Sequence, residues 1–122
     1  MNEYVQAVRH LACQILDLLG EGLGLRDPAA SSRLVTTTDS DSLVRINNYP
    51  PSATGDGGVK AASAVGFGEH SDPQILSVLR ANDVDGLQVL LPDGRGEDAW
   101  VQVPADPAAF FINVGDLLQV IG

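Results

Sequence analysis

The sequence predicts a mainly β protein with one packed N-terminal helix, arranged as a partial jelly-roll (double-stranded β-helix) barrel. Three observations support this fold class. Apolar residues near the N-terminus recur at helical spacing, the residues from 42 onward form short runs rich in Val, Ile and Leu, and turn-forming residues separate those runs. With 122 residues, the chain is long enough for one domain only.

The first predicted element is an amphipathic helix over Asn2–Leu19. Its apolar side chains fall within a stripe about 140° wide at roughly 100° per residue, which is typical of a helix with one face in a core. The stripe consists of Val5, Val8, Leu11, Ala12, Ile15, Leu18 and Leu19. Glycine at position 20, 22 or 24 can end the helix, and Asp27-Pro28 marks a loop. We therefore assign residues 1–41 to the N-terminal helix and a connecting loop.

The second predicted part, residues 42–122, is the partial jelly-roll domain. It contains six short runs of β-forming residues bounded by Gly, Pro, Asn or Asp. The runs are Ser42–Asn48, Ile75–Arg80, Leu87–Leu91, Trp100–Val103, Ala109–Val114 and Leu117–Ile121. Residues 50–58 are rich in Pro and Gly and are predicted to form a surface loop. Because predicted elements reach almost to both ends of the chain, we expect a fragment that lacks both ends.

The charge balance argues against two classes of partner. There are 7 basic and 16 acidic side chains, for a net charge of −9, and the basic residues form no cluster. Nucleic acids and anionic membranes both require basic surfaces, so we expect neither as a partner. Cys13 is the only cysteine, which excludes an internal disulfide and a cysteine-based zinc site. This cysteine usage is typical of a reducing compartment and predicts a cytoplasmic location.

The segment 66–73 is the part of the sequence that points most directly to chemistry. If it is extended, His70 and Asp72 lie on the same side of the strand and can bind one metal ion. A neutral imidazole and a carboxylate are two members of the 2-His-1-carboxylate triad that binds non-haem Fe(II). The alternative is a hydrogen-bonded surface histidine beside a turn aspartate that precedes Pro73. The neighbouring predicted strands and the polar, aromatic segment 45–51 favour the metal site.

Three co-linear segments carry a resemblance to a known family. They are Arg-Ile-Asn-Asn-Tyr-Pro-Pro at 45–51, the stretch 66–89 that begins Gly-Phe-Gly-Glu-His-Ser-Asp-Pro, and Phe-Phe-Ile-Asn-Val-Gly-Asp-Leu-Leu-Gln-Val at 110–120. Together they resemble the plant iron(II)- and 2-oxoglutarate-dependent dioxygenases, and within them the gibberellin 2-oxidases. The resemblance implies that His70 and Asp72 bind Fe(II) and that Asn47 and Tyr49 bind 2-oxoglutarate.

The roles implied for Asn47 and Tyr49 are physically reasonable. An amide and a phenol can orient the two carboxylates of a small dianion without adding charge. The alternative for Tyr49 is a half-buried aromatic side chain at the end of a strand. For the whole chain, the resemblance implies an enzyme that uses Fe(II), 2-oxoglutarate and oxygen to hydroxylate a gibberellin at carbon 2, which inactivates the hormone.

The sequence also departs from the family pattern. A second histidine ligand is expected downstream of Asp72, but the chain contains only His10 and His70, and His10 lies on the polar face of the predicted helix. No arginine has a serine two residues later, so the Arg-x-Ser clamp for 2-oxoglutarate is absent. The N-terminal region that caps the substrate is also missing. We therefore expect the 122-residue chain alone to be inactive.

Two alternatives to a gibberellin oxidase follow from these departures. The chain could be a catalytically silent, truncated barrel, because two of three ligands hold iron weakly and unpaired strand edges favour aggregation. It could also belong to a related plant dioxygenase that acts on another metabolite, such as a flavonoid.

Overall fold

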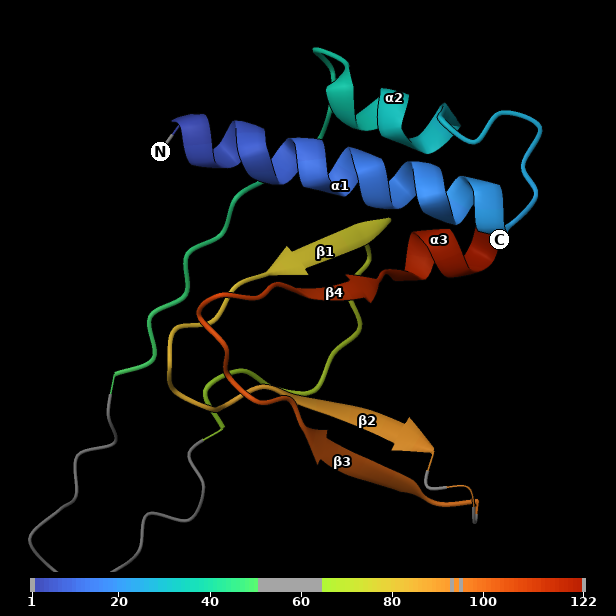
Figure 1. The fold of residues 1–122 in the computed structure, drawn as a ribbon. Coiled ribbons are helices and arrows are strands. Elements are labelled where there is room, and N and C mark those ends of the chain that lie inside the picture. The colour runs from blue at the N-terminus through green and yellow to red at the C-terminus, as the bar shows by residue number, and fades with distance from the viewer. Residues whose placement is uncertain (1, 51–64, 93, 95, 122) are drawn as a thin grey trace, which may run out of the picture. The chain divides into compact units, whose positions relative to one another are not determined.

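The computed structural model describes residues 2–50, 65–92, 94 and 96–121 (Figure 1). The chain forms two compact units, Met1–Ser71 and Asp72–Gly122. Most of the predicted surface loop at 50–58 lies outside the described residues. Among the helices described, none is both long enough and apolar enough to cross a membrane.

The N-terminal helix is confirmed as α1, Asn2–Gly22, which extends three residues beyond its predicted end. It ends in a Schellman motif, in which the amide of Leu25 donates to the carbonyl of Gly20 and the amide of Gly24 donates to that of Glu21, both at 3.0 Å. Gly24 has a φ of 67°, the left-handed conformation that this motif requires and glycine adopts without strain. The glycine at position 24 therefore ends the helix, as one of the three predicted alternatives.

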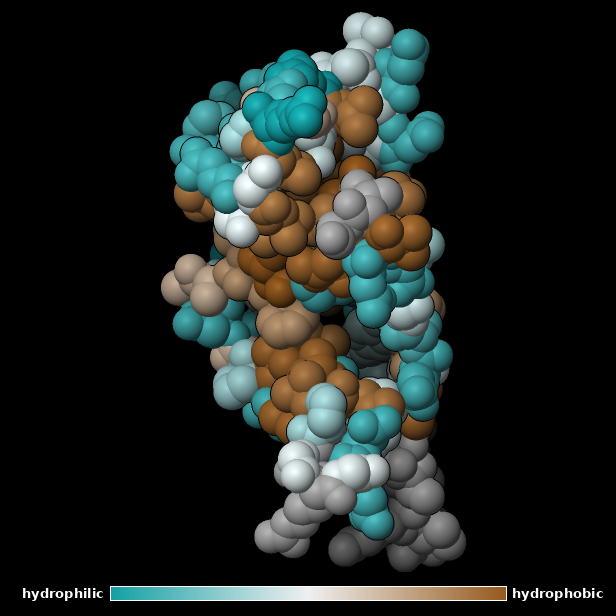
Figure 2. Space-filling model, turned by 90° about the vertical axis from the view of Figure 1, so that its right-hand side faces the viewer, coloured by the Kyte–Doolittle hydropathy of each residue, from teal (hydrophilic) through white to brown (hydrophobic). Residues whose placement is uncertain are grey.

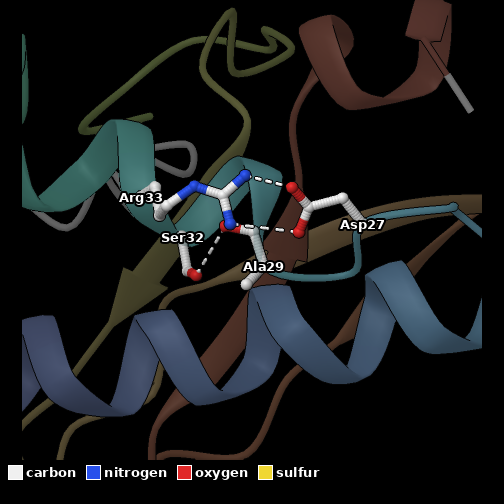
Figure 3. A network of polar contacts seen from close by, with 4 residues as sticks. All are labelled: Asp27, Ala29, Ser32 and Arg33. Carbon is white, nitrogen blue, oxygen red and sulfur yellow. Dashed lines mark hydrogen bonds and ion pairs between the residues drawn. The ribbon is translucent and has the colours of Figure 1, made fainter.

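A second helix, α2 (Ala30–Thr36), lies beside α1 in the first unit, so the prediction of a connecting loop is wrong here. Local contacts hold its first turn (Figure 3). The Ser32 hydroxyl donates to the carbonyl of Ala29 at 3.1 Å, and the Arg33 guanidinium forms a two-pronged ion pair with Asp27. A seven-residue helix has little stability of its own, so packing on α1 explains why it forms where the sequence reads as a loop.

The buried face of α1 differs slightly from the predicted stripe. Leu16, outside that stripe, is only 2% exposed, and Gly20 is buried. The Cys13 thiol lies 3.8 Å from the carbonyl of Ser32 in α2, which places residues 13, 16 and 20 on the face toward α2. Leu18, a predicted stripe residue, is 65% exposed and corrects the prediction. The most buried residues of α1 therefore lie at the edge of its predicted apolar stripe, on the side that contacts α2.

The second unit contains four strands in two antiparallel pairs. One sheet pairs β1 (Leu76–Leu79) with β4 (Phe111–Val114), and the other pairs β2 (Gln88–Pro92) with β3 (Asp98–Gln102). These strands confirm four of the six predicted runs. The chain thus combines small antiparallel sheets with an N-terminal helix, as predicted, while the partial jelly-roll barrel stays a prediction.

The other two predicted strands are wrong. Residues 42–48 have no strand assignment, because a strand needs a hydrogen-bonding neighbour and none of the described residues supplies one. Residues 117–121 belong instead to helix α3, Asp116–Ile121. The carbonyl of Gly115 accepts hydrogen bonds from the amides of Leu118 and Gln119, and Asp116 lies in the first turn, where a carboxylate is favourable.

Large hydrophobic side chains are mostly accessible in the described part of the chain. Leu16 in the first unit and Leu118 in the second are buried, whereas Leu90 and Trp100, paired across β2 and β3, are 38% and 49% exposed. Figure 2 shows hydrophobic surface spread over much of the face in view. Each unit therefore has only a small core of its own.

Candidate functional site

Asn47 and Tyr49 lie together on an open hollow in the first unit. The hollow measures about 450 Å³ and is lined by Ile46, Asn47, Asn48, Tyr49, Pro50, Gly66 and Phe67. This volume is within the range of small-molecule sites. Tyr49 is 56% exposed and lies in a segment without strand structure, so it is not the half-buried aromatic at a strand end that the alternative describes.

The ring of Tyr49 lies against the backbone of Gly66. A Cβ atom built on Gly66 would lie 2.6 Å from Cδ1 of Tyr49 and 2.9 Å from its Cε1, closer than real Cβ atoms approach other atoms. The absence of a side chain at Gly66 thus allows the ring to occupy this position. Both residues belong to motifs visible in the sequence, but no sequence pattern connects them, because the contact joins segments far apart along the chain.

His70 is exposed, and two neighbours along the chain fix its ring. Nδ1 lies 2.8 Å from the carbonyl oxygen of Gly68. A carbonyl can only accept, so Nδ1 carries the proton and donates it, which leaves the lone pair of the neutral ring on Nε2. The Phe67 ring meets the imidazole edge to face, with centroids 4.4 Å apart and an interplanar angle of 88°. Nε2 is therefore the nitrogen suited to bind a metal ion.

Asp72 is half-buried at the start of the second unit, and its carboxylate is held by two side chains. Oδ2 accepts hydrogen bonds from the Ser77 hydroxyl at 2.5 Å and from the Asn113 amide at 2.7 Å. The backbone of Asp72 is also held, because its carbonyl accepts from the amide of Asp116 at 2.7 Å. Ser77 and Asn113 were not identified from the sequence as parts of the site.

The four predicted site residues are divided between the two units. Asn47, Tyr49 and His70 belong to the first unit and Asp72 to the second. Residues 69–75 are not in a strand, so the alternation expected of an extended segment does not establish a common side for His70 and Asp72. Their shared binding of a metal ion stays a prediction.

The available donor set fits part of a non-haem iron site. One imidazole nitrogen and one carboxylate oxygen are two of the three protein ligands in the 2-His-1-carboxylate arrangement. His10 is exposed on α1, as predicted for a solvated surface histidine. In the part of the chain that the structure describes, no cluster of three or more His, Cys, Asp or Glu residues could hold a metal ion.

Comparison with known proteins gives two findings. A sequence model of the 2OG-Fe(II) oxygenase superfamily matches residues 40–122. The chain is also 65% identical to gibberellin 2-beta-dioxygenase 2 of Oryza sativa subsp. japonica, 52% to gibberellin 2-beta-dioxygenase 4 of Arabidopsis thaliana and 46% to gibberellin 2-beta-dioxygenase 1 of Pisum sativum. Each alignment covers 99% of this chain but only 35%, 38% and 35% of the relative, so the chain spans about a third of their length.

Proposed function

The chain belongs to the 2OG-Fe(II) oxygenase superfamily, and on this premise we propose that it is part of a gibberellin 2-oxidase. The observation that carries the proposal is the 65% identity, over 99% of the chain, to a protein named gibberellin 2-beta-dioxygenase. The proposed reaction hydroxylates a gibberellin at carbon 2, with 2-oxoglutarate and oxygen as co-substrates.

We assign the metal to His70 and Asp72. Nε2 of His70 and the Asp72 carboxylate supply a nitrogen and an oxygen donor, which suit Fe(II). When bound, Fe(II) supplies the oxygen chemistry and couples it to the decarboxylation of 2-oxoglutarate. Hydrogen bonds hold both ligands in fixed orientations. His70 donates one to the carbonyl of Gly68, and Asp72 accepts two, from Ser77 and Asn113.

We assign 2-oxoglutarate to Asn47 and Tyr49. Both line the same open hollow, and their amide and phenol groups can donate hydrogen bonds to a carboxylate. The contact of Tyr49 with Gly66 supports this role, since it fixes the ring that carries the phenol. In the complete protein, we expect the strands to close a jelly-roll barrel around these groups. A cytoplasmic location is also part of the proposal and rests on the single cysteine.

The test is turnover by the full-length protein that contains this chain. Purified protein with Fe(II) and 2-oxoglutarate is incubated with a gibberellin or a flavonoid, and the products are identified by mass spectrometry. The expected products are a 2-hydroxylated gibberellin and an equal amount of succinate. His70→Ala should abolish both products, whereas His10→Ala, the matched control on the exposed face of α1, should leave them unchanged.

Two other results would favour the alternatives. Hydroxylation of the flavonoid but not of the gibberellin would favour a related dioxygenase with another substrate. Absence of any product and of any bound iron would favour a catalytically silent barrel. We consider this second candidate because the chain contains only two histidines.

A further inference from the structure

We propose that Ser77 and Asn113 are positioning residues that orient the Asp72 carboxylate for metal binding. The proposal rests on the proposed function, which makes Asp72 a metal ligand, but it concerns residues that the ligand motif does not contain. Ser77 lies five residues after Asp72, and Asn113 lies 41 residues after it.

The register of the β1–β4 sheet places the two donors together. Ser77 in β1 and Asn113 in β4 are directly opposite each other. Opposite residues of an antiparallel pair project from the same face of the sheet, so both side chains reach the same ligand. Each donates to Oδ2 of Asp72, the hydroxyl at 2.5 Å and the amide at 2.7 Å.

The backbone after β4 holds the same aspartate from a second direction. The amide of Asp116 donates to the carbonyl of Asp72 at 2.7 Å, and the amide of Gly115 donates to the carbonyl of Ile75 at 3.0 Å. Gly115 is buried, and a Cβ atom there would overlap the carbonyl of Gln74 and lie 2.8 Å from that of Asp72. The turn at 72–75 is therefore fixed against the junction of β4 and α3.

These contacts determine how the carboxylate is presented. Two donors on Oδ2 fix the plane of the carboxylate, and with it the direction of Oδ1. The hydroxyl and the amide are uncharged, so they hold the Asp72 carboxylate without adding a positive charge that would compete with a metal ion. Residues that hydrogen-bond a metal ligand typically change metal affinity by about 10- to 100-fold when removed. Ser77 and Asn113 have the geometry of such residues.

The experiment measures binding of Co²⁺, a spectroscopic substitute for Fe(II), to the full-length protein. The dissociation constant and the visible absorption bands are recorded for the unmodified protein, Ser77→Ala and Asn113→Leu. Ser77→Thr keeps the hydroxyl and serves as the rescue variant. Ile112→Val is the matched control, because Ile112 neighbours Asn113 in β4 but points to the opposite face of the sheet. Thermal unfolding of each variant is measured in parallel.

The expected result is a Co²⁺ dissociation constant raised about 10- to 100-fold in Ser77→Ala and in Asn113→Leu, with altered absorption bands. Ser77→Thr and Ile112→Val should bind Co²⁺ like the unmodified protein, even where Ile112→Val unfolds at a lower temperature. Ser77→Ala removes a single oxygen atom, so it decides the question if Asn113→Leu does not fold.

Two results would overturn the proposal, and they can be told apart. If the unmodified protein binds Co²⁺ and both donor variants bind it equally well, the positioning role fails while the metal site stands. If affinity falls in Ile112→Val as much as in the donor variants, the effect follows sheet stability and the positioning role fails as well. If the unmodified protein binds no Co²⁺, the metal assignment fails, and the positioning role fails with it.

Discussion

At the scale of single residues, the contact between Gly66 and the Tyr49 ring sets the position of the phenol. A methyl group at Gly66 would have to displace the ring, because the Cβ would lie 2.6 Å from Cδ1. Since Tyr49 is 56% exposed, the ring can move without disturbing a core. We therefore expect the cost to fall on the 2-oxoglutarate binding that we propose for Tyr49, and not on folding.

We predict that Gly66→Ala raises KM for 2-oxoglutarate in the full-length protein roughly fivefold, the equivalent of one hydrogen bond of about 1 kcal/mol. The free energy of unfolding should change little. Gly68→Ala is the control, because a Cβ there meets no atom within 4 Å. Steady-state kinetics with varied 2-oxoglutarate provide the measurement. An unchanged KM in Gly66→Ala would remove Tyr49 from the 2-oxoglutarate site.

Gly115 is the residue whose substitution should harm folding most directly. Its Cβ would overlap backbone atoms of the turn at 72–75, and backbone cannot rotate away as a side chain can. Gly115→Ala should lower the free energy of unfolding by about 1–3 kcal/mol, the usual cost of overpacking. Urea denaturation measures this change. Gly86→Ala, where a Cβ meets nothing within 4 Å, should unfold like the unmodified protein, and equal stability of both variants would contradict the prediction.

At the scale of elements, the ion pair at the start of α2 makes that helix sensitive to acid. The hydrogen bond from Arg33 is the largest influence on the pKa of Asp27 and lowers it below its ordinary value of 3.8. Partial burial opposes this shift, while the positive charge of Arg33 and a backbone hydrogen bond from Ala29 add to it. A carboxylate with a depressed pKa stabilises the folded state above that ordinary value. The contribution is lost as the pH falls through the lowered pKa.

We predict that the Asp27 carboxyl titrates at a lower pH in the unmodified chain than in Arg33→Gln, because the variant loses the hydrogen bond and the positive charge of Arg33. Carbon-detected NMR of the Asp27 carboxyl across the acid range gives both values. The effect on overall stability should be small, because both side chains are exposed and solvent screens their charges. Identical titration curves in the two proteins would show that the ion pair does not form in solution.

The elements that the sequence predicts correctly are those whose pattern is local. α1 has a long run of helical periodicity, and the four confirmed strands are bounded by clear turn residues. α3 was missed because its Leu, Val and Ile residues are typical of a strand, while Gly115-Asp116, which begins the helix, also reads as a turn. α2 depends on α1, and a contact between elements has no local signature.

The candidate site divides in the same way. His70, Asp72, Asn47 and Tyr49 are named by short motifs, which the sequence displays directly. Ser77 and Asn113 are not, because their role depends on the register of β1 and β4 and on a contact between residues 41 positions apart. No pattern of residue spacing predicts a contact between residues so far apart in the sequence. Likewise, the packing of Tyr49 on Gly66 becomes visible only in three dimensions.

At the scale of the whole molecule, the paired strands fall short of what an independent sheet requires. Each sheet has two strands among the described residues, whereas three or more strands, or a covering helix, are usually needed for stability in water. Leu90 and Trp100 on the β2–β3 hairpin are also substantially exposed. These features predict a chain that gains much of its stability from residues outside the 122.

We predict that the 122-residue chain expressed alone shows no sharp thermal transition and self-associates through its strand edges and exposed apolar side chains. Scanning calorimetry and sedimentation velocity test this directly. The full-length protein, measured under the same conditions, should unfold in a cooperative transition. A monomeric 122-residue chain with a sharp transition would contradict the prediction and show that its small cores suffice.

The hydrogen bonds from Asn113 and Asp116 to Asp72 can form only late in translation of the chain. On the ribosome, Asp72 is made before both donors, and Asn113 follows it by 41 residues. At a translation rate of roughly 5–20 residues per second, about 2–8 s pass between the synthesis of Asp72 and that of Asn113. Until then the Asp72 carboxylate lacks the hydrogen bond from Asn113, although Ser77 has already been made. If Asp72 binds iron as we propose, the fully oriented ligand is available only after β4 has been translated and has paired with β1.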